Sequence, residues 1–303
     1  MPQGTVLGPL YFLIYINDIN QNLSKLSKMR LFADDSLVYR EIKNSKDCKA
    51  LQEDLDSLQE WEKTWKMEFH PDKCQVLKIT NKKNKVEDEY TLHGQTLKES
   101  NKAKYLGVTI DNKLDWKEHQ NAMCNKANNV LAFLKRNLGK CPTNIKDKCY
   151  KAFVKPILGY GGCVWDPHHK NKIENIEKVQ KRAGRFVTNN YRMSHGNTKK
   201  NMSKLGWIPL EEDRARNKVT RLFKTINNIT TIPINNLSTT KVNTRRGNNK
   251  FLIPHSSVDS HKYSYFPSTL RLWNNLPSSI KLGSDVNTFK KNIKHIELIP
   301  LKR

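Results

Sequence analysis

The sequence predicts an α+β protein in which an antiparallel sheet with packed helices is followed by a mostly helical region. Between residues 29 and 111, short apolar, β-prone runs alternate with turn residues. Beyond residue 116, apolar residues recur every three or four positions, which is the period of an amphipathic helix. Six Trp, ten Tyr and ten Phe among 303 residues can anchor a core, although only 37% of the residues are apolar. We expect three parts, residues 1–115, 116–226 and 227–303.

The longest apolar run, VLGPLYFLIYI at residues 6–16, predicts a buried helix. It is far shorter than the roughly 20 residues that a membrane-spanning helix needs, and it lacks the basic segment that begins a signal peptide. A Pro-Gln-Gly loop precedes it, and Gly4 and Gly8 leave the backbone open to close approach there. We therefore expect no membrane segment.

The stretch MRLFADDSLVYR, residues 29–40, predicts a hairpin. Met29 to Ala33 and Ser36 to Arg40 are strand-like, and Asp34-Asp35 suits the tip. Adjacent carboxylates repel each other, and neither strand offers them a partner. They either lie on a solvated turn, where Asp is a common residue, or bind a strongly cationic ligand.

A helix should follow the hairpin and pack on the same sheet. Ser45 is a plausible N-cap, with Asp47 in the first turn. Steps of three and four residues connect the members of one apolar stripe: Leu51, Leu55, Leu58, Trp61 and Trp65.

Further strands are expected after this helix. Residues 74–80 and 105–111 each predict one strand, and residues 90–99 predict a hairpin that turns at His93-Gly94. The charged stretch at residues 81–89 predicts a loop.

Three helices are expected in the second part of the chain. The first carries apolar residues from 123 to 138 and ends at Gly139. The second starts at Thr143 and is kinked by Pro156, and the third spans residues 173–186. Residues 227–262 then predict a loop or linker, and residues 265–277 predict a terminal element that docks on the rest.

The net charge of +25, with a pI near 9.8, favours a polyanionic partner, most commonly nucleic acid. Between residues 170 and 250, Lys and Arg outnumber Asp and Glu by 19 to 5. The alternative is a basic but otherwise ordinary protein whose charged helix faces are merely solvated. Residues 178–186 offer a basic face of Lys178, Lys181, Arg182 and Arg185, with Phe186, Tyr191 and Trp207 nearby for base stacking.

The six cysteines are scattered and contain no Cys-x-x-Cys pair, so neither a disulfide framework nor a zinc knuckle is expected. Cys163 with His168 and His169 comes nearest to a metal cluster, but its spacing is unlike that of typical ligand pairs. A reducing intracellular compartment is the simpler inference.

Four motifs in order resemble the reverse transcriptases of non-LTR (LINE-like) retrotransposons. PQGTVLGPLYFLIYINDI resembles the family's template-and-nucleotide motif, and LFADDSLVY resembles its catalytic hairpin. WEKTWKMEFHPDKCQVLKI continues the pattern, and KYLGVTID resembles the primer-gripping hairpin. Three later stretches, KPILGYGGCVWDP, KVQKRAGRFV and FPSTLRLWNNLP, are similar to the downstream regions of jockey-type elements.

The resemblance implies a partial polymerase palm followed by a helical thumb and a C-terminal extension. It also implies an RNA template, a DNA primer, dNTPs and access to the nucleus. Two Mg²⁺ or Mn²⁺ ions would serve the reaction, since hard cations prefer carboxylate oxygens. The implied site residues are Asp34 as principal metal ligand, Asp35 as its auxiliary neighbour, Lys73 near the triphosphate, Gln3 and Gly4 at the nucleotide and template, and Tyr105, Leu106 and Gly107 at the primer.

One departure from the family leads us to expect an inactive chain. The family carries another metal-binding aspartate upstream of the Pro-Gln-Gly loop, whereas Met1 stands directly before Pro2. A palm sheet without that strand also leaves an edge exposed. We expect a truncated polymerase fragment. The alternatives are a non-catalytic basic RNA- or DNA-binding remnant and a chain that is never stably made.

Overall fold

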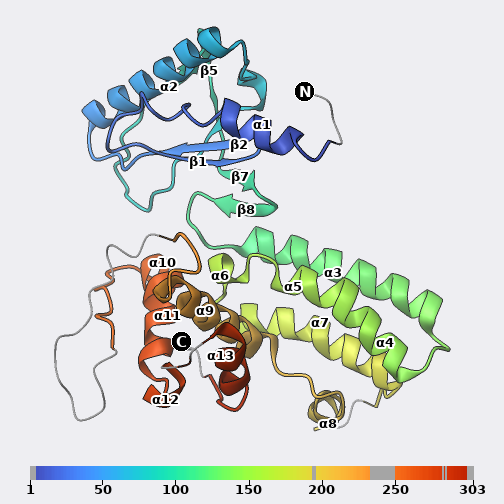
Figure 1. Ribbon diagram of the computed structural model, residues 1–303. Helices are drawn as coiled ribbons and strands as arrows, with labels where there is room; N and C mark the ends of the chain where they lie inside the picture. Colours follow the sequence, from blue (N-terminus) through green and yellow to red (C-terminus); the bar gives the residue numbers. More distant parts are fainter. Residues whose placement is uncertain (1–4, 193–195, 233–249, 282, 284, 299–303) are drawn as a thin grey trace. The chain divides into compact units, whose positions relative to one another are not determined.

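The computed structural model describes residues 5–192, 196–232, 250–281, 283 and 285–298 (Figure 1). The chain divides into an N-terminal unit, residues 1–114, and a C-terminal unit, residues 115–303. The two units differ sharply in charge. The N-terminal unit has 18 Lys and Arg against 17 Asp and Glu, whereas the C-terminal unit has 36 against 12. The basic character of the sequence therefore resides almost entirely in the C-terminal unit.

The N-terminal unit combines two α-helices with short strands. Where the sequence predicts one antiparallel sheet, the described residues form four separate two-stranded sheets, of which β3–β6 is parallel. Four of the strands have only two residues each, too few to join the pairs into one sheet. The elements are α1 (Gly8–Tyr15), β1 (Lys28–Phe32), β2 (Asp35–Tyr39), α2 (Ser45–Trp65), the 3₁₀ helix η1 (Pro71–Lys73), β3 (Gln75–Val76), β4 (Thr91–Leu92), β5 (Gln95–Thr96), β6 (Lys98–Glu99), β7 (Lys102–Tyr105) and β8 (Val108–Asp111).

The N-cap of helix α2 lies one residue earlier than predicted. Asn44, not Ser45, is the N-cap, because its side chain accepts the backbone N–H of Lys46 at 2.9 Å and belongs to a capping box with Asp47. The helix ends at Trp65, where Lys66 turns left-handed with φ +54°.

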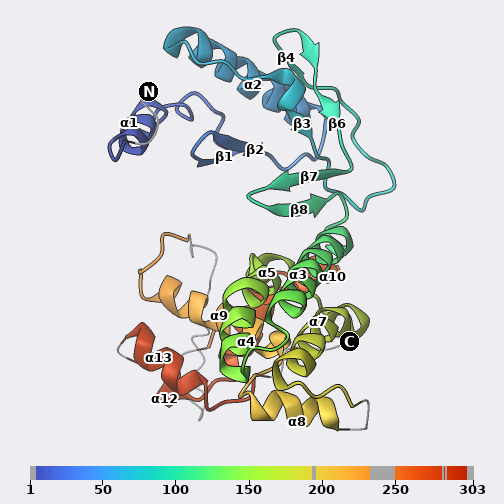
Figure 2. The same cartoon turned by 90° about the vertical axis from the view of Figure 1, so that its right-hand side faces the viewer.

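The core of the N-terminal unit lies between α2 and the β1–β2 hairpin. Leu58 and Trp61, from the predicted stripe on α2, are buried in one cluster with Met29 of β1. Val38 of β2 packs against the same cluster. Figure 2 shows α2 and the hairpin from a second side. The prediction that the stripe packs on the hairpin's sheet is confirmed.

The prediction of a buried helix at residues 6–16 is wrong for α1. None of its residues is buried, and Ile14 is 72% exposed. The helix is apolar all round, but the small unit covers only the side that carries Phe12 and Tyr15, which pack against the core. The first buried residues of this segment are Ile16 and Ile19, which follow the helix.

Two hairpin turns fix the path of the later strands. His93 and Gly94 have φ of +52° and +72°, as the predicted hairpin requires. Residues 105–111 do not form one strand, because Leu106 and Gly107 also have positive φ and fold the segment into the β7–β8 hairpin. The strand predicted at residues 74–80 shrinks to β3, and residues 81–89 lack helix and strand, as expected.

The regular elements of the C-terminal unit, among its described residues, are helices joined by turns and loops. The kink predicted at Pro156 takes the form of a π-helical turn directly before α5. Proline offers no N–H to the preceding turn, and a wider turn accommodates that loss. The elements are α3 (Lys117–Leu138), α4 (Thr143–Cys149), the π-helix η2 (Tyr150–Val154), α5 (Lys155–Gly159), α6 (Gly162–Trp165), α7 (Lys170–Thr188), α8 (Asn197–Lys204), α9 (Leu210–Ile226), α10 (Asp259–Lys262), α11 (Tyr265–Asn274), α12 (Ser278–Lys281) and α13 (Val286–Ile293).

Helices α9, α11 and α13 share one apolar core. Phe223 of α9 stacks on Phe289 of α13 with ring centroids 4.2 Å apart, and Trp273 of α11 lies beside them. The segment 265–277 therefore docks as predicted. Of the loop predicted at residues 227–262, residues 233–249 lie outside the described residues, and its end forms α10. No helix among the described residues is long and apolar enough to cross a membrane.

Candidate functional site

The β1–β2 hairpin presents the two predicted aspartates in different ways. The strands pair from Lys28 opposite Tyr39 to Phe32 opposite Asp35, so that Ala33 and Asp34 alone form the turn. Asp34 lies on the turn, and Asp35 is the first residue of β2. Both side chains are exposed. The turn requires a positive φ of +50° at Ala33, where glycine or asparagine would be usual.

The base of the hairpin is tied to the start of α2. Arg40, directly after β2, donates from Nη1 to Oγ of Ser24 at 2.7 Å. Its Nη2 also lies 3.6 Å from Oδ1 of Asp47, the carboxylate of the capping box. Hydrogen bonds from the backbone of Lys43 and of Asn44, together with the charge of Arg40, hold the pKa of Asp47 below its usual value against the opposing effect of desolvation.

A buried carboxylate in α2 fixes the segment that leads into β1. Asp54 accepts the backbone N–H of Ser24 at 2.6 Å and its hydroxyl at 2.9 Å. It also accepts the hydroxyl of Ser27, the residue before β1. Sequence reasoning missed Asp54. Its position, three residues after Leu51 and four before Leu58, places it on the apolar side of the helix, where a carboxylate needs partners.

The other predicted residues of the N-terminal unit lie on separate elements. Lys73 ends η1 and is exposed. Leu106 and Gly107 form the β7–β8 turn, and Tyr105 is the last residue of β7. Gln3 and Gly4 lie outside the described residues. No described hydrogen bond or ion pair joins Lys73 to either aspartate of the hairpin.

Metal-ligand geometry is incomplete in the part of the chain that the structure describes. No group of three or more His, Cys, Asp and Glu residues is placed to hold a metal ion there. Asp34 and Asp35 thus supply oxygen ligands of the type that Mg²⁺ prefers, without a third protein carboxylate beside them. His168 stacks on Tyr263 with ring centroids 3.9 Å apart, and it forms no metal cluster with Cys163. All six cysteines are free.

The predicted basic face lies on α7, which packs beside α3 (Figure 1). Lys178, Lys181 and Arg182 are exposed, and Arg185 is half-buried. Arg182 donates to Oδ1 of Asn128 on α3 at 3.1 Å, which bridges the two helices.

A further cation, Lys135 of α3, approaches the same face and was missed in the sequence. Burial lowers the pKa of Lys135, and the charges of Arg185 and Arg182 lower it further. Positive groups from two helices therefore converge, and no spacing rule within one helix reveals such a contact.

The predicted stacking residues are mostly unavailable. Phe186 is 2% exposed, since it continues the apolar stripe of α7. Trp207 is also buried, because it stacks on Tyr150 at 4.1 Å and donates to Asp147 at 2.8 Å. Of the three predicted aromatics, only Tyr191 is exposed. The prediction fails because residues close to a basic run in sequence lie on the inner side of its helix.

The family model that matches residues 1–110 is described as "Reverse transcriptase (RNA-dependent DNA polymerase)". The segment that carries the aspartate hairpin and α2 is thus similar to reverse transcriptases. Three curated relatives from Drosophila specify the class further. The chain is 29% identical over 202 residues to a probable RNA-directed DNA polymerase from transposon BS of Drosophila melanogaster. It is 26% and 31% identical to the RNA-directed DNA polymerases from mobile element jockey of Drosophila melanogaster and Drosophila funebris.

These matches confirm the resemblance to reverse transcriptases of non-LTR, jockey-like retrotransposons. Each of the three covers 62% of the chain but 22% of the relative. The chain therefore matches about a fifth of the length of these curated relatives. No solved structure matches the chain.

Proposed function

We propose that the N-terminal unit carries part of the metal site of an RNA-directed DNA polymerase. The observation that supports this most is the hairpin that holds Asp34 on its turn and Asp35 at the start of β2, within the segment that matches the family. When bound, Mg²⁺ or Mn²⁺ would activate the primer 3′-hydroxyl and neutralise charge on the pyrophosphate. Asp34 is the principal ligand, and Asp35 supports it.

The remaining residues of the proposed site hold substrates. Lys73, exposed at the end of η1, places a positive charge near the triphosphate of the dNTP. The β7–β8 turn at Tyr105, Leu106 and Gly107 contacts the DNA primer. Gln3 and Gly4 contact the incoming nucleotide and the RNA template.

Binding of Mn²⁺ tests the hairpin directly. In NMR spectra of the chain, low concentrations of Mn²⁺ should broaden the amide signals of Asp34 and Asp35 before all others. The substitution Asp34→Asn should remove this selectivity. The acidic run at residues 87–89 is the internal control, because it offers a comparable density of exposed carboxylates without the hairpin. Equal broadening at that run would count against a metal site on the hairpin.

The 303-residue chain assayed alone should not polymerise DNA, since the described carboxylates do not complete a group of three around Asp34. Primer extension on an RNA template with Mg²⁺ and four dNTPs tests this. Robust synthesis that is lost on Asp34→Ala would overturn the proposed inactivity while supporting the assignment of the hairpin.

A second candidate function is binding of RNA or DNA by the C-terminal unit. Its excess of 36 Lys and Arg over 12 Asp and Glu favours it, together with the convergence of Lys135 and Arg182 between α3 and α7. Binding should weaken steeply with salt, with a slope of about −0.9 per neutralised phosphate on duplex DNA.

Substitution separates this function from catalysis. The variant that replaces Lys178, Lys181, Arg182 and Arg185 by Ala should lose affinity and salt dependence, whereas Asp34→Ala should change neither. Replacement of Lys82, Lys83 and Lys85 in the N-terminal unit is the charge control. If that control weakened binding as much as the α7 variant, overall charge rather than the α7 face would account for the affinity.

A further inference from the structure

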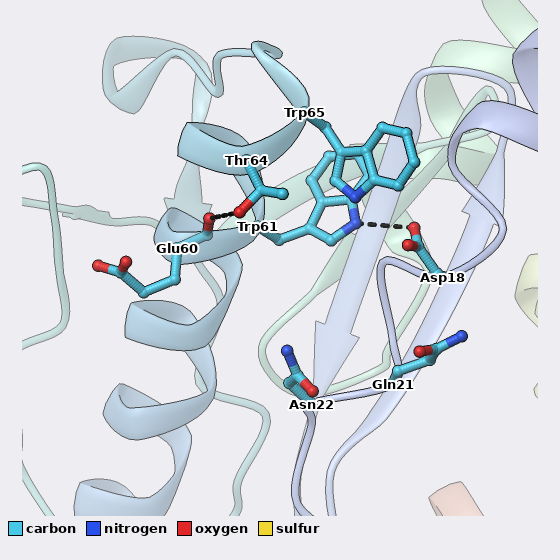
Figure 3. A pocket seen from close by; sticks show the side chains of 7 residues that line it. All are labelled: Asp18, Gln21, Asn22, Glu60, Trp61, Thr64 and Trp65. Atoms are coloured by element: carbon cyan, nitrogen blue, oxygen red, sulfur yellow. Dashed lines mark hydrogen bonds between the residues drawn. The ribbon is translucent and has the colours of Figure 1, made fainter.

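A surface pocket lies between α2 and the segment that follows α1, and the proposed polymerase site uses none of its residues, although four of them lie within the stretches that carry the family resemblance. Its volume is about 240 Å³ (Figure 3). We call it the indole–aspartate pocket. No Lys, Arg or His lines it, and the lining residues are Asp18, Gln21, Asn22, Glu60, Trp61, Thr64 and Trp65.

The carboxylate of Asp18 has no compensating charge. Trp61 donates from Nε1 to Oδ1 of Asp18 at 2.8 Å, but this donor is neutral. Among the described residues, no ion pair includes Asp18, although the side chain is partly buried. Glu60 also lines the pocket, but its carboxylate points away from the indoles in Figure 3 and pairs with Lys63 at 2.7 Å. The half-buried carboxylate of Asp18, beside two indoles, is therefore available to bind a cationic ligand.

The aromatic wall is held in place before any ligand arrives. Trp65 remains 38% exposed, yet its ring is fixed by the edge of Tyr15 at a centroid distance of 5.3 Å. The hydroxyl of Tyr15 also donates to the backbone oxygen of Trp65. The ring of Trp61 lies 6.3 Å from that of Trp65, tilted by 32°. An exposed indole of fixed orientation is the best side-chain surface for a cation.

We propose that the indole–aspartate pocket binds the guanidinium group of an arginine side chain on a partner protein. A planar guanidinium stacks on an indole while its edge donates to a carboxylate, whereas an ammonium ion is more strongly hydrated and cannot stack. The amide oxygen of Asn22 supplies a further acceptor, whereas the hydroxyl of Thr64 donates to the backbone oxygen of Glu60 at 3.0 Å. The pocket is below the roughly 300–1,000 Å³ of sites for larger ligands, which suits one side chain.

Charge on the wider surface is compatible with a basic partner. The N-terminal unit is nearly neutral, with 18 Lys and Arg against 17 Asp and Glu. Helix α2 exposes three acidic residues, Glu53, Asp56 and Glu60, and also three basic ones, Lys46, Lys49 and Lys63, so the preference for a cation depends on Asp18 in the pocket. The inference does not depend on Asp34 or Asp35. It can therefore be tested independently of the proposed polymerase function.

Peptide binding to the full chain tests the proposal. Blocked Gly-Arg-Gly is titrated while the indole N–H signals of Trp61 and Trp65 are followed by NMR. We expect a saturable shift of both signals. Blocked Gly-citrulline-Gly, which keeps the shape without the charge, should produce none, and blocked Gly-Lys-Gly should bind more weakly. A citrulline or lysine peptide that bound as well as the arginine peptide would overturn the assignment of a guanidinium ligand.

Variants assign the binding to the pocket. Asp18→Asn keeps an acceptor for Trp61 but should weaken binding roughly tenfold, as expected for loss of a charge-assisted hydrogen bond. Trp65→Leu should weaken it about threefold. Glu53→Gln removes an exposed charge from the same helix outside the pocket and should change nothing. Unchanged binding in Asp18→Asn, with Trp61 still in its native signal position, would refute the proposal.

Free L-arginine separates the two sources of a guanidinium group. Free L-arginine has the same net charge as the blocked peptide but lacks the flanking peptide groups, so it should bind less tightly than the peptide if the ligand is a side chain of a partner protein. Equal or tighter binding of free arginine would replace the partner protein by a small-molecule ligand and overturn that part of the inference.

Discussion

Replacement of Asp54 by Ala should strongly destabilise the N-terminal unit. The buried carboxylate accepts both the backbone N–H and the hydroxyl of Ser24, and also the hydroxyl of Ser27. A hydrogen bond to a charged group is worth about 1.5–3 kcal/mol. The three are not additive, and breaking a buried polar network by removal of one partner typically costs about 3–5 kcal/mol. We expect a loss in this range, a large share of the ~5–15 kcal/mol that stabilises a domain.

Hydrogen exchange of the β1 and β2 amides under increasing urea measures this loss in the N-terminal unit alone. The midpoint of exchange should fall by roughly 1–5 M urea at the slopes of about 1–3 kcal/mol per M usual for small proteins. Asp56→Ala is the matched control, because Asp56 lies on the exposed side of the same helix and should cost less than about 0.5 kcal/mol. If Asp54→Ala and Asp56→Ala behaved alike, the contacts of Asp54 would not hold the hairpin in place.

Three other substitutions test separate features. Ala33→Gly should stabilise the hairpin by about 1 kcal/mol in thermal unfolding, because it relieves a φ of +50°; a lower midpoint would contradict this. Burial alone would raise the pKa of Asp166, but Lys218 and Arg214 outweigh it and hold the pKa below 3.8. The ionised Asp166 therefore contributes its full stabilisation above pH 3.8, and this contribution is lost as the pH falls through the lowered pKa. The free energy of unfolding of Asp166→Asn should accordingly lie below that of the wild type near neutral pH and approach it only at strongly acidic pH. Phe289→Ala should cost about 3–5 kcal/mol in urea unfolding, as for a fully buried ring.

Periodicity and turn chemistry predicted the elements that depend on local sequence. The stripe from Leu51 to Trp65 identifies α2 because a helix with one apolar side has a definite period. His93-Gly94 identifies a hairpin turn because glycine tolerates the φ of +72° observed there. Pro156 identifies the kink because its ring removes a donor from the helix. In each of these cases, the cause lies within a few residues of its effect.

Features that depend on what packs against a segment were not predictable in this way. The helix α1 is apolar on every side, so its sequence contains no period that tells a buried face from an exposed one. Lys135 joins Arg182 only because α3 and α7 pack together. Phe186 seemed suited to stacking beside a basic run, yet the same run continues an apolar stripe that takes the ring inward. The resemblance to a family supplied Asp34 and Asp35, which the turn alone would not distinguish from solvated aspartates.

The division of charge between the units bears on how the proposed functions relate. The sequence average of +25 suggests one basic surface, but residues 1–114 have a net charge of +1. The carboxylates of the hairpin therefore receive little help from the charge of their own unit, and a bound divalent ion is the stronger source of compensation. Under the proposed nucleic-acid binding, by contrast, phosphates would contact the positive charge of the C-terminal unit. Raising the salt concentration should accordingly weaken nucleic-acid binding steeply while it changes Mn²⁺ binding at Asp34 far less. If salt weakened nucleic-acid binding and Mn²⁺ binding equally, the same set of charges would govern both.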